Sequence, residues 1–326
     1  MSTHFRSCWA TDFEALLRFK RSLGYRYARS EFTLREFDRF LLRLPAYQRR
    51  AECLDQAILA WLASKPHRKA ISVSADASVL RQFCLYLRRC PNRSKVSEPH
   101  WPRLPRESTF VPYLFSEGDI RRLLQLAAQL TQPAFRAALY QALLLLLYCT
   151  GLRFGEALRL RMKDVNTHAG VLFVEMFKGR ARWVPFHRSL SRELDKYLTA
   201  RRAFAPAEPD DLFFIGVNKR TLSVNTASET LRALFRKAGL KPDRGRIGPR
   251  PYDLRHVFAV ARLTRWSQQG VDLQARLPWL SAYMGHDDIL GTETYLNATP
   301  ELLGLAAHRF RRRYLSARKQ GSKGES

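Results

Sequence analysis

Cysteine is scarce in this chain, and its spacing argues against two kinds of cross-link. Five cysteines occur among 326 residues, and no two of them form a Cys-x-x-Cys pair. The odd number and irregular spacing disfavour a disulfide framework and a zinc site built on such pairs. We therefore expect reduced thiols in a cytosolic protein. The cysteines are Cys8, Cys53, Cys84, Cys90 and Cys149.

Long apolar runs are also missing. The longest, Ala142 to Tyr148, is far too short for a bilayer span, which takes about 20 apolar residues. It is more typical of a buried core helix. The first residues, Met1 to Ala10, show no signal-peptide pattern. The sequence therefore predicts neither a membrane span nor a secretory leader.

Acidic residues are few in comparison with basic ones. The chain has 29 Asp and Glu against 56 Lys and Arg, a formal net charge of +27, and the excess is spread along the whole length. Such a field attracts a polyanion, and neutralisation of phosphates is its usual use. The alternative is a ribosomal-type or merely very soluble basic protein. We expect binding to nucleic acid.

Helical periodicity dominates the first part of the chain. Apolar spacing predicts four helices, in one of which Phe32, Phe37, Phe40, Leu41 and Leu44 fall on one side. Together these helices are expected to form a helical domain over residues 1–89. A proline-rich linker is predicted over 90–112, because proline removes backbone donors and disfavours helix before it. The four expected helices cover 9–23, 32–44, 54–63 and 76–88, and the linker prolines are Pro91, Pro99, Pro102, Pro105 and Pro112.

The second part, 113–315, is predicted to be a larger domain that is mainly α with a small antiparallel β-sheet. The β-branched and aromatic segment 170–176 and the segment 182–185 indicate a hairpin with Gly179 in its turn. Ser116 and Asp119 are typical of a capped helix start. The tail 316–326 is expected to be disordered. Helices are expected at about 116–129, 133–149, 153–162, 189–203, 226–238, 252–268, 275–284, 288–297 and 300–314.

Two arginines stand at places suited to binding a phosphodiester. Arg153 lies in the segment 150–156, Thr-Gly-Leu-Arg-Phe-Gly-Glu, and Arg255 lies in the segment 252–256, Tyr-Asp-Leu-Arg-His. Guanidinium groups match phosphate oxygens and stay charged at any working pH. Glu156, three residues after Arg153, is placed to orient its guanidinium. For any single arginine the ordinary interpretation is a solvated charge or a surface ion pair.

Three further side chains complete a set that can attack a phosphodiester without a metal. Lys178, at the hairpin turn, can protonate a leaving oxygen, although a plain phosphate contact is the commoner role and Arg180 and Arg182 compete for it. His286 can donate a hydrogen bond to a phosphate oxygen. The hydroxyl of Tyr295, nine residues later, is the candidate nucleophile if neighbouring positive charge activates it.

The order and spacing of these residues resemble the tyrosine recombinase (phage integrase) family across the whole chain. The resemblance implies a helical core DNA-binding domain and a catalytic domain. It implies that Arg153 and Arg255 clamp the scissile phosphate, that Lys178 is the acid, and that His286 is a phosphate donor. Tyr295 would form a 3′-phosphotyrosyl link. Among family members, the chain looks most similar to recombinases of insertion elements and integrative elements.

One position departs from the family pattern. Tyr252 stands where the second arginine box usually begins with histidine, and it cannot carry charge or act as a base near neutral pH. His256 is present but matches a histidine common in the family, which suggests a supporting role. Two other functions therefore stay open: a DNA-binding accessory protein with an impaired site, and a type IB topoisomerase.

The resemblance also implies partners. It predicts double-stranded DNA as substrate and no cofactor or metal. It further predicts a homo-tetramer on two DNA sites or a mixed assembly with related recombinases, in a cytoplasmic, nucleoid-associated protein.

Overall fold

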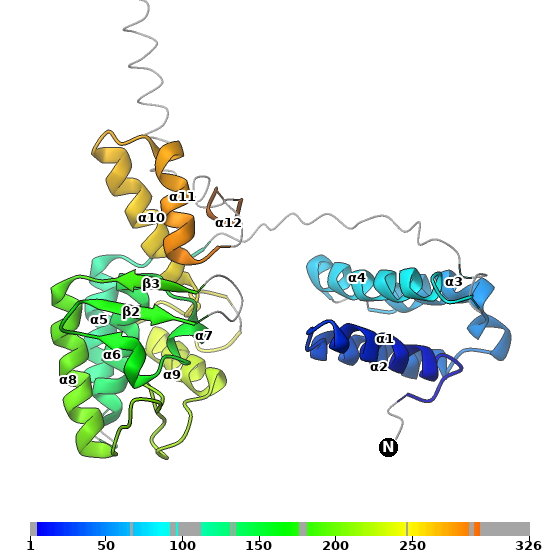
Figure 1. The fold of residues 1–326 in the computed structure, drawn as a ribbon, viewed down its shortest axis with the longest axis horizontal. Coiled ribbons are helices and arrows are strands. Elements are labelled where there is room, and N and C mark those ends of the chain that lie inside the picture. The colour runs from blue at the N-terminus through cyan, green and yellow to red at the C-terminus, as the bar shows by residue number, and fades with distance from the viewer. Residues whose placement is uncertain are drawn as a thin grey trace, which may run out of the picture. The chain divides into compact units, whose positions relative to one another are not determined.

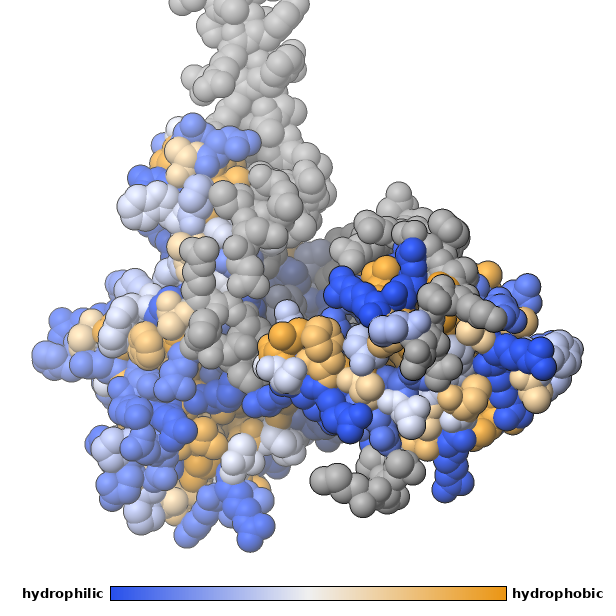
Figure 2. Space-filling view, turned by 45° about the vertical axis from the view of Figure 1, so that its right-hand side comes forward, coloured by the Kyte–Doolittle hydropathy of each residue, from blue (hydrophilic) through white to orange (hydrophobic). Residues whose placement is uncertain are grey.

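The computed structural model describes residues 5–65, 68–91, 96, 112–130, 133, 135–175, 181–245, 247–286 and 290–293. The chain divides into two compact units, Met1–Phe110 and Val111–Ser326. On the face shown in Figure 2, hydrophilic residues cover most of the described surface, and hydrophobic residues form small separate groups. None of the described helices combines the length and apolar character needed to cross a membrane.

The first unit is a bundle of helices, drawn in blue and cyan in Figure 1. Phe13 and Phe83 are fully buried at its centre with ring centroids 4.5 Å apart, and Phe37 joins them. The carboxylate of Asp38 accepts the backbone N–H groups of Arg6 and Ser7 and so ties the preceding chain to the bundle. The helices are α1 Ala10–Ser22, α2 Ala28–Leu41, α3 Leu54–Ala63 and α4 Ala70–Leu87, with short 3-10 turns at Ala46–Arg49 and Ala51–Cys53.

The four predicted helices of this unit are present, but the apolar face predicted for the second helix, α2, differs from the one observed. Phe32 is 60% exposed, whereas Phe37 and Leu41 are fully buried. Phe32 precedes Phe37 by five residues, which places the two rings far apart around a helix of 3.6 residues per turn. The sequence prediction that grouped Phe32 with the core face was therefore wrong.

The second unit is built around α6, Phe135–Thr150, the buried core helix that the apolar run predicted. It packs against α5, Glu117–Ala128, α8, Arg188–Phe204, and α10, Asp253–Gln268. The predicted cap of α5 is confirmed: the Ser116 hydroxyl accepts the Asp119 N–H at 3.1 Å, and the Asp119 carboxylate accepts the Ser116 N–H at 2.9 Å.

The predicted sheet is present as three antiparallel strands in the order β1-β2-β3. They span Val165–Asn166, Val171–Val174 and Arg182–Pro185, and Leu172 pairs with Val184. Leu172 and Val184 face the core, while the rings of Phe173 and Trp183 meet at a tilt on the other face, with centroids 4.9 Å apart. The turn that joins β2 to β3 lies outside the described residues.

The expected helix over 153–162 is much shorter than predicted. Only α7, Phe154–Ala157, is α-helical, and a 3-10 turn follows at Met162–Asp164. The backbone N–H of Met162 donates to Asp211 O at 2.9 Å, and that of Phe213 donates to Leu160 O at 2.7 Å. The chain leaves the helix because a segment about fifty residues away supplies these hydrogen bonds instead.

The last described helices are α9 Val224–Lys237, α10, α11 Leu273–Met284 and the short α12 Leu290–Glu293. α9 packs against α5, whereas α10, α11 and α12 lie together at the other end of the unit (Figure 1). α11 contacts both α10 and β3 (Figure 1). These contacts bring the end of α11 next to the start of α7 and the edge of the sheet. The predicted helix 300–314, the tail, and most of the linker and of helix 288–297 lie outside the described residues.

Candidate active site

Arg255 comes from the first turn of α10 and is deeply buried. It is only 1% exposed. Its Nη1 donates to Gly151 O at 2.6 Å and its Nη2 to Met284 O at 2.8 Å. Gly151 has φ of +62°, and a Cβ there would collide with the ring of Phe258. Only glycine therefore suits the turn that presents this carbonyl to Arg255.

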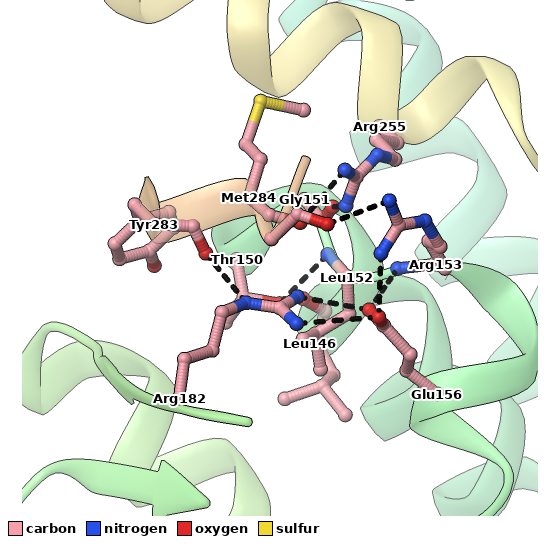
Figure 3. A network of polar contacts seen from close by, with 11 residues as sticks. Leu146, Thr150, Gly151, Leu152, Arg153, Glu156, Arg182, Arg255, Tyr283 and Met284 are labelled. Carbon is pink, nitrogen blue, oxygen red and sulfur yellow. Dashed lines mark hydrogen bonds and ion pairs between the residues drawn. The ribbon is translucent and has the colours of Figure 1, made fainter. Parts of the chain in front are cut away.

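Arg153 lies at the start of α7, directly after that turn. Its Nη2 donates to Gly285 O at 2.7 Å, 132 residues away along the chain. Its side chain is 24% exposed, which leaves it more open than Arg255. The two predicted phosphate-binding arginines thus lie side by side (Figure 3), and both reach backbone carbonyls at the end of α11.

Glu156 lies between two arginines. Its Oε1 accepts from Arg153 Nη1 at 2.9 Å, and its Oε2 accepts from Arg182 Nη2 at 2.9 Å and from the Arg153 backbone N–H. Burial by itself would raise the pKa of Glu156. The hydrogen bonds and charge of Arg182, together with the bonds from Arg153, outweigh it and hold the pKa below its ordinary value. The carboxylate is therefore ionised, and it binds both the guanidinium and the backbone N–H of Arg153.

Arg182 is the residue whose placement the sequence interpretation missed. It was considered only as a competitor of Lys178, but its side chain is 8% exposed and bonds to Glu156 and to Tyr283 O. The signal was available in the strand alternation. Side chains two apart in a strand share a face, so an inward Val184 places Arg182 inward as well.

Three consecutive carbonyls at the end of α11 each accept a hydrogen bond from a different arginine. Tyr283 O accepts from Arg182, Met284 O from Arg255, and Gly285 O from Arg153 (Figure 3). The last carbonyls of a helix have no partner within it, and this end carries a partial negative charge. Cations from β3, α10 and α7 therefore meet at one helix end.

His286 follows this helix end directly. Gly285 closes α11 with φ of +66°, and the backbone N–H of His286 donates to Ser281 O at 3.0 Å. The imidazole is half-buried, with Nδ1 2.6 Å from the hydroxyl of the buried Thr292. This contact fixes the orientation of the imidazole ring next to the three carbonyls that the arginines bind.

Tyr252 and His256 lie one turn apart at the start of α10. Tyr252 is 41% exposed, and its ring meets that of His256 edge-on with centroids 5.1 Å apart. Burial lowers the pKa of the half-buried His256; Asp253 opposes this effect, and Arg250 and Arg255 add to it. His256 is therefore neutral near pH 7, in keeping with a supporting role.

Lys178 and Tyr295 lie outside the described residues. Tyr283, another tyrosine near the arginines, is a poor substitute for Tyr295 as nucleophile. Burial raises the pKa of its hydroxyl to about 12, and the hydroxyl donates to Pro185 O at 3.1 Å. Among the described residues, no group of three or more His, Cys, Asp or Glu side chains could hold a metal ion.

Comparisons with known proteins identify the family of this chain. Residues 114–301 match the model of the phage integrase family. The chain is 35% identical over 310 residues to y4rB of Sinorhizobium fredii (strain NBRC 101917 / NGR234), which is named as an integrase/recombinase. That alignment covers 91% of this chain and 95% of the relative. This chain is also 26% identical to the tyrosine recombinase XerC of Bacillus subtilis (strain 168), over 71% of this chain and 72% of XerC.

Solved structures share the fold. The Tn1549 transposon integrase, in complex with transposon right-end DNA, matches with a TM-score of 0.68 and 14% identity, covering 93% of this chain and 98% of that one. The XerH site-specific recombinase, bound to its difH substrate in a post-cleavage complex, matches with a TM-score of 0.67 and 16% identity, covering 94% and 86%. The chain therefore belongs to the phage integrase family and is a tyrosine recombinase.

Proposed function

We propose that this chain cuts and rejoins DNA strands at specific sites through a 3′-phosphotyrosyl intermediate, for integration, excision or transposition of a mobile element. One observation carries the proposal. Arg153 and Arg255 come from separate elements, yet each binds one of the last two carbonyls before His286, at the end of a third element, α11. A structural ion pair would not need three elements aimed at one helix end.

The chemistry follows from the residue types. The Tyr295 hydroxyl loses its proton to water as its oxygen attacks the scissile phosphorus, the bond to the 5′ oxygen breaks, and Lys178 gives that oxygen its proton. Arg153, Arg255 and His286 stabilise the charge that grows on the non-bridging oxygens. Attack by a new 5′ hydroxyl reverses the step and releases the tyrosine. The bond energy is kept in the phosphotyrosyl link, so no cofactor or metal is proposed.

Two features of the described residues shape this mechanism. Arg255 is almost fully covered and bound to Gly151 O and Met284 O, so DNA binding must expose one of its N–H groups to the phosphate. Tyr252 has an exposed ring at the position that histidine usually occupies, where its hydroxyl donates a hydrogen bond to the phosphate without serving as a base.

The substrate is double-stranded DNA, which the net charge of +27 favours. We assign residues 1–89 to core DNA binding, 90–112 to a linker, and 113–315 to catalysis, with a disordered tail at 316–326. The active assembly is a tetramer on two DNA sites, or a mixed assembly with related recombinases, close to the nucleoid in the cytoplasm.

The decisive experiment is covalent trapping on a nicked duplex made from the DNA that flanks the gene. The full chain should give a protein–DNA adduct that survives denaturing electrophoresis. Tyr295→Phe should bind the same duplex and give no adduct. Tyr283→Phe is the matched control, because it also removes one tyrosine hydroxyl, which donates to Pro185 O, and it should keep the adduct. An adduct that persists in Tyr295→Phe would assign the nucleophile elsewhere.

An accessory DNA-binding role is the second candidate, favoured by Tyr252 and by the covered guanidinium of Arg255. Binding without any adduct would support it. A supercoiled plasmid distinguishes the third possibility: relaxation alone indicates a type IB topoisomerase, whereas products that need two cognate sites indicate recombination.

A further inference from the structure

Arg182 joins three elements of the site, and its side chain is almost fully covered. It projects from β3, its Nη atoms bond to Glu156 at the start of α7, and its Nε bonds to the end of α11 at 2.7 Å. Its side chain is 8% exposed, whereas that of Arg153 is 24% exposed. Figure 3 shows the guanidinium of Arg182 between Glu156 and the backbone of Tyr283.

We propose that Arg182 is a positioning residue for strand cleavage: it holds the Glu156 carboxylate so that Arg153 is aimed at the scissile phosphate. This inference rests on the proposed function. The same guanidinium anchors Tyr283 O, three residues before His286, and so fixes the turn that presents the imidazole.

All three nitrogens of the Arg182 guanidinium donate hydrogen bonds, and a lysine ammonium could not make the same set. Three nitrogens in one plane reach two carboxylate oxygens and one carbonyl at the same time. A lysine at this position keeps the charge but has a single nitrogen, which cannot satisfy the carboxylate and the carbonyl in the same geometry. The residue is therefore specified as arginine by shape as well as by charge.

The Arg182 guanidinium is packed closely by its neighbours. A Cβ on Gly285 would lie 2.7 Å from Arg182 Cζ, so the guanidinium packs directly against the backbone that precedes His286. Glu156 is shared, and its two oxygens bind Arg153 on one side and Arg182 on the other. Loss of Arg182 frees the carboxylate to follow Arg153, and the aim of Arg153 is lost.

The test uses the full chain and the nicked duplex defined above, with Arg182→Lys and Glu156→Gln as variants. Arg202→Ala is the matched control, since it removes an exposed arginine from α8. We expect Arg182→Lys to keep its folded fraction and its DNA affinity. The single-turnover rate of adduct formation should fall by about 100-fold, which is the effect expected when a catalytic group such as Arg153 is displaced by about 1 Å. Arg202→Ala should form the adduct at the wild-type rate.

Two further measurements separate positioning from mere stabilisation. The double variant Arg182→Lys/Glu156→Gln should be no slower than the slower single variant, because both changes act through one contact. On a duplex with an uncharged methylphosphonate at the scissile position, the Arg182→Lys deficit should shrink, because the aim of a cation matters less there.

The outcomes are distinct. An unchanged rate in folded Arg182→Lys would overturn the proposal, as would a deficit of equal size on both duplexes or a rate that only follows the folded fraction. If Arg182→Lys does not fold, Glu156→Gln must show the same loss and the same methylphosphonate effect, or the proposal fails. A wild-type chain that forms no adduct would instead refute the proposed function, and this inference with it.

Discussion

Replacing Gly285 with alanine tests the close approach of Arg182 to the backbone before His286. The backbone at this position has φ of +66°, which alanine avoids. The new Cβ would also lie 2.7 Å from Arg182 Cζ and 3.1 Å from Arg182 Nε. The strained backbone costs about 1 to 2 kcal/mol. Displacing the guanidinium weakens its bonds to a buried carboxylate, which adds about 1.5 to 3 kcal/mol. We expect a total loss of about 2.5 to 5 kcal/mol in the free energy of unfolding.

Gly239 offers a matched control. It also ends a helix with a positive φ, +71°, but no atom lies within 4 Å of the position that a Cβ would take. Gly239→Ala should therefore cost only the backbone term, about 1 to 2 kcal/mol. A double variant, Gly285→Ala with Arg182→Ala, removes the clash and should lose less than the sum of its two single variants.

Hydrogen–deuterium exchange of the α6 amides, followed by mass spectrometry, measures the unfolding free energy of the second unit within the full chain. This choice matters because the chain has two compact units, and a single global transition would mix them. If Gly285→Ala costs no more than Gly239→Ala, the guanidinium of Arg182 does not pack against Gly285, and the account of this helix end is wrong.

The remaining predictions concern charge. Glu156→Gln breaks a buried pair and should lower the free energy of unfolding by about 3 kcal/mol at neutral pH. Because the folded-state pKa of Glu156 is depressed, this difference should persist above about pH 4.5 and shrink as the pH falls further. Urea titrations over a pH series would reveal it, and a constant difference would contradict the pairing. The pKa of His256 is lowered from 6.5, chiefly by burial, so the unfolded chain takes up that proton first. Stability should fall as the pH drops through 6.5, and the slope should be smaller in His256→Gln; equal slopes would refute this. Affinity for duplex DNA, measured by fluorescence anisotropy, should fall steeply with salt, with a log–log slope of about −0.9 per phosphate contact. A flat response would mean that the positive charge does not face DNA.

Local signals accounted for much of the fold. The apolar run of α6, the Ser116–Asp119 cap of α5 and the alternating strands β2 and β3 were predictable, because each depends on neighbours within a few residues. The segment 153–162 was predicted poorly for the opposite reason. At its end, the backbone of residues 160–163 forms hydrogen bonds with residues 209–213, and no local pattern reports that.

The same division applies to the site. Arg153, Glu156, Arg255 and His286 could be chosen from the sequence because their motifs carry residue types suited to a phosphodiester. Tyr252 was equally visible as a departure. Arg182 was not chosen, since an arginine in a basic hairpin is ordinarily a solvated phosphate contact. Its inward direction depends on the register of β3 against β2.

The sequence by itself determined the chemistry that this protein carries: the arginines, the histidine, the family, and the excess of positive charge. Only the tertiary structure decided how those groups are held. Arg182, Arg255 and Arg153 meet at the last carbonyls of α11 from β3, α10 and α7, which lie 101, 29 and 132 residues from their acceptors along the chain. The physical reason is that a buried guanidinium must find acceptors wherever the packed elements present them, and only folding brings those acceptors into reach.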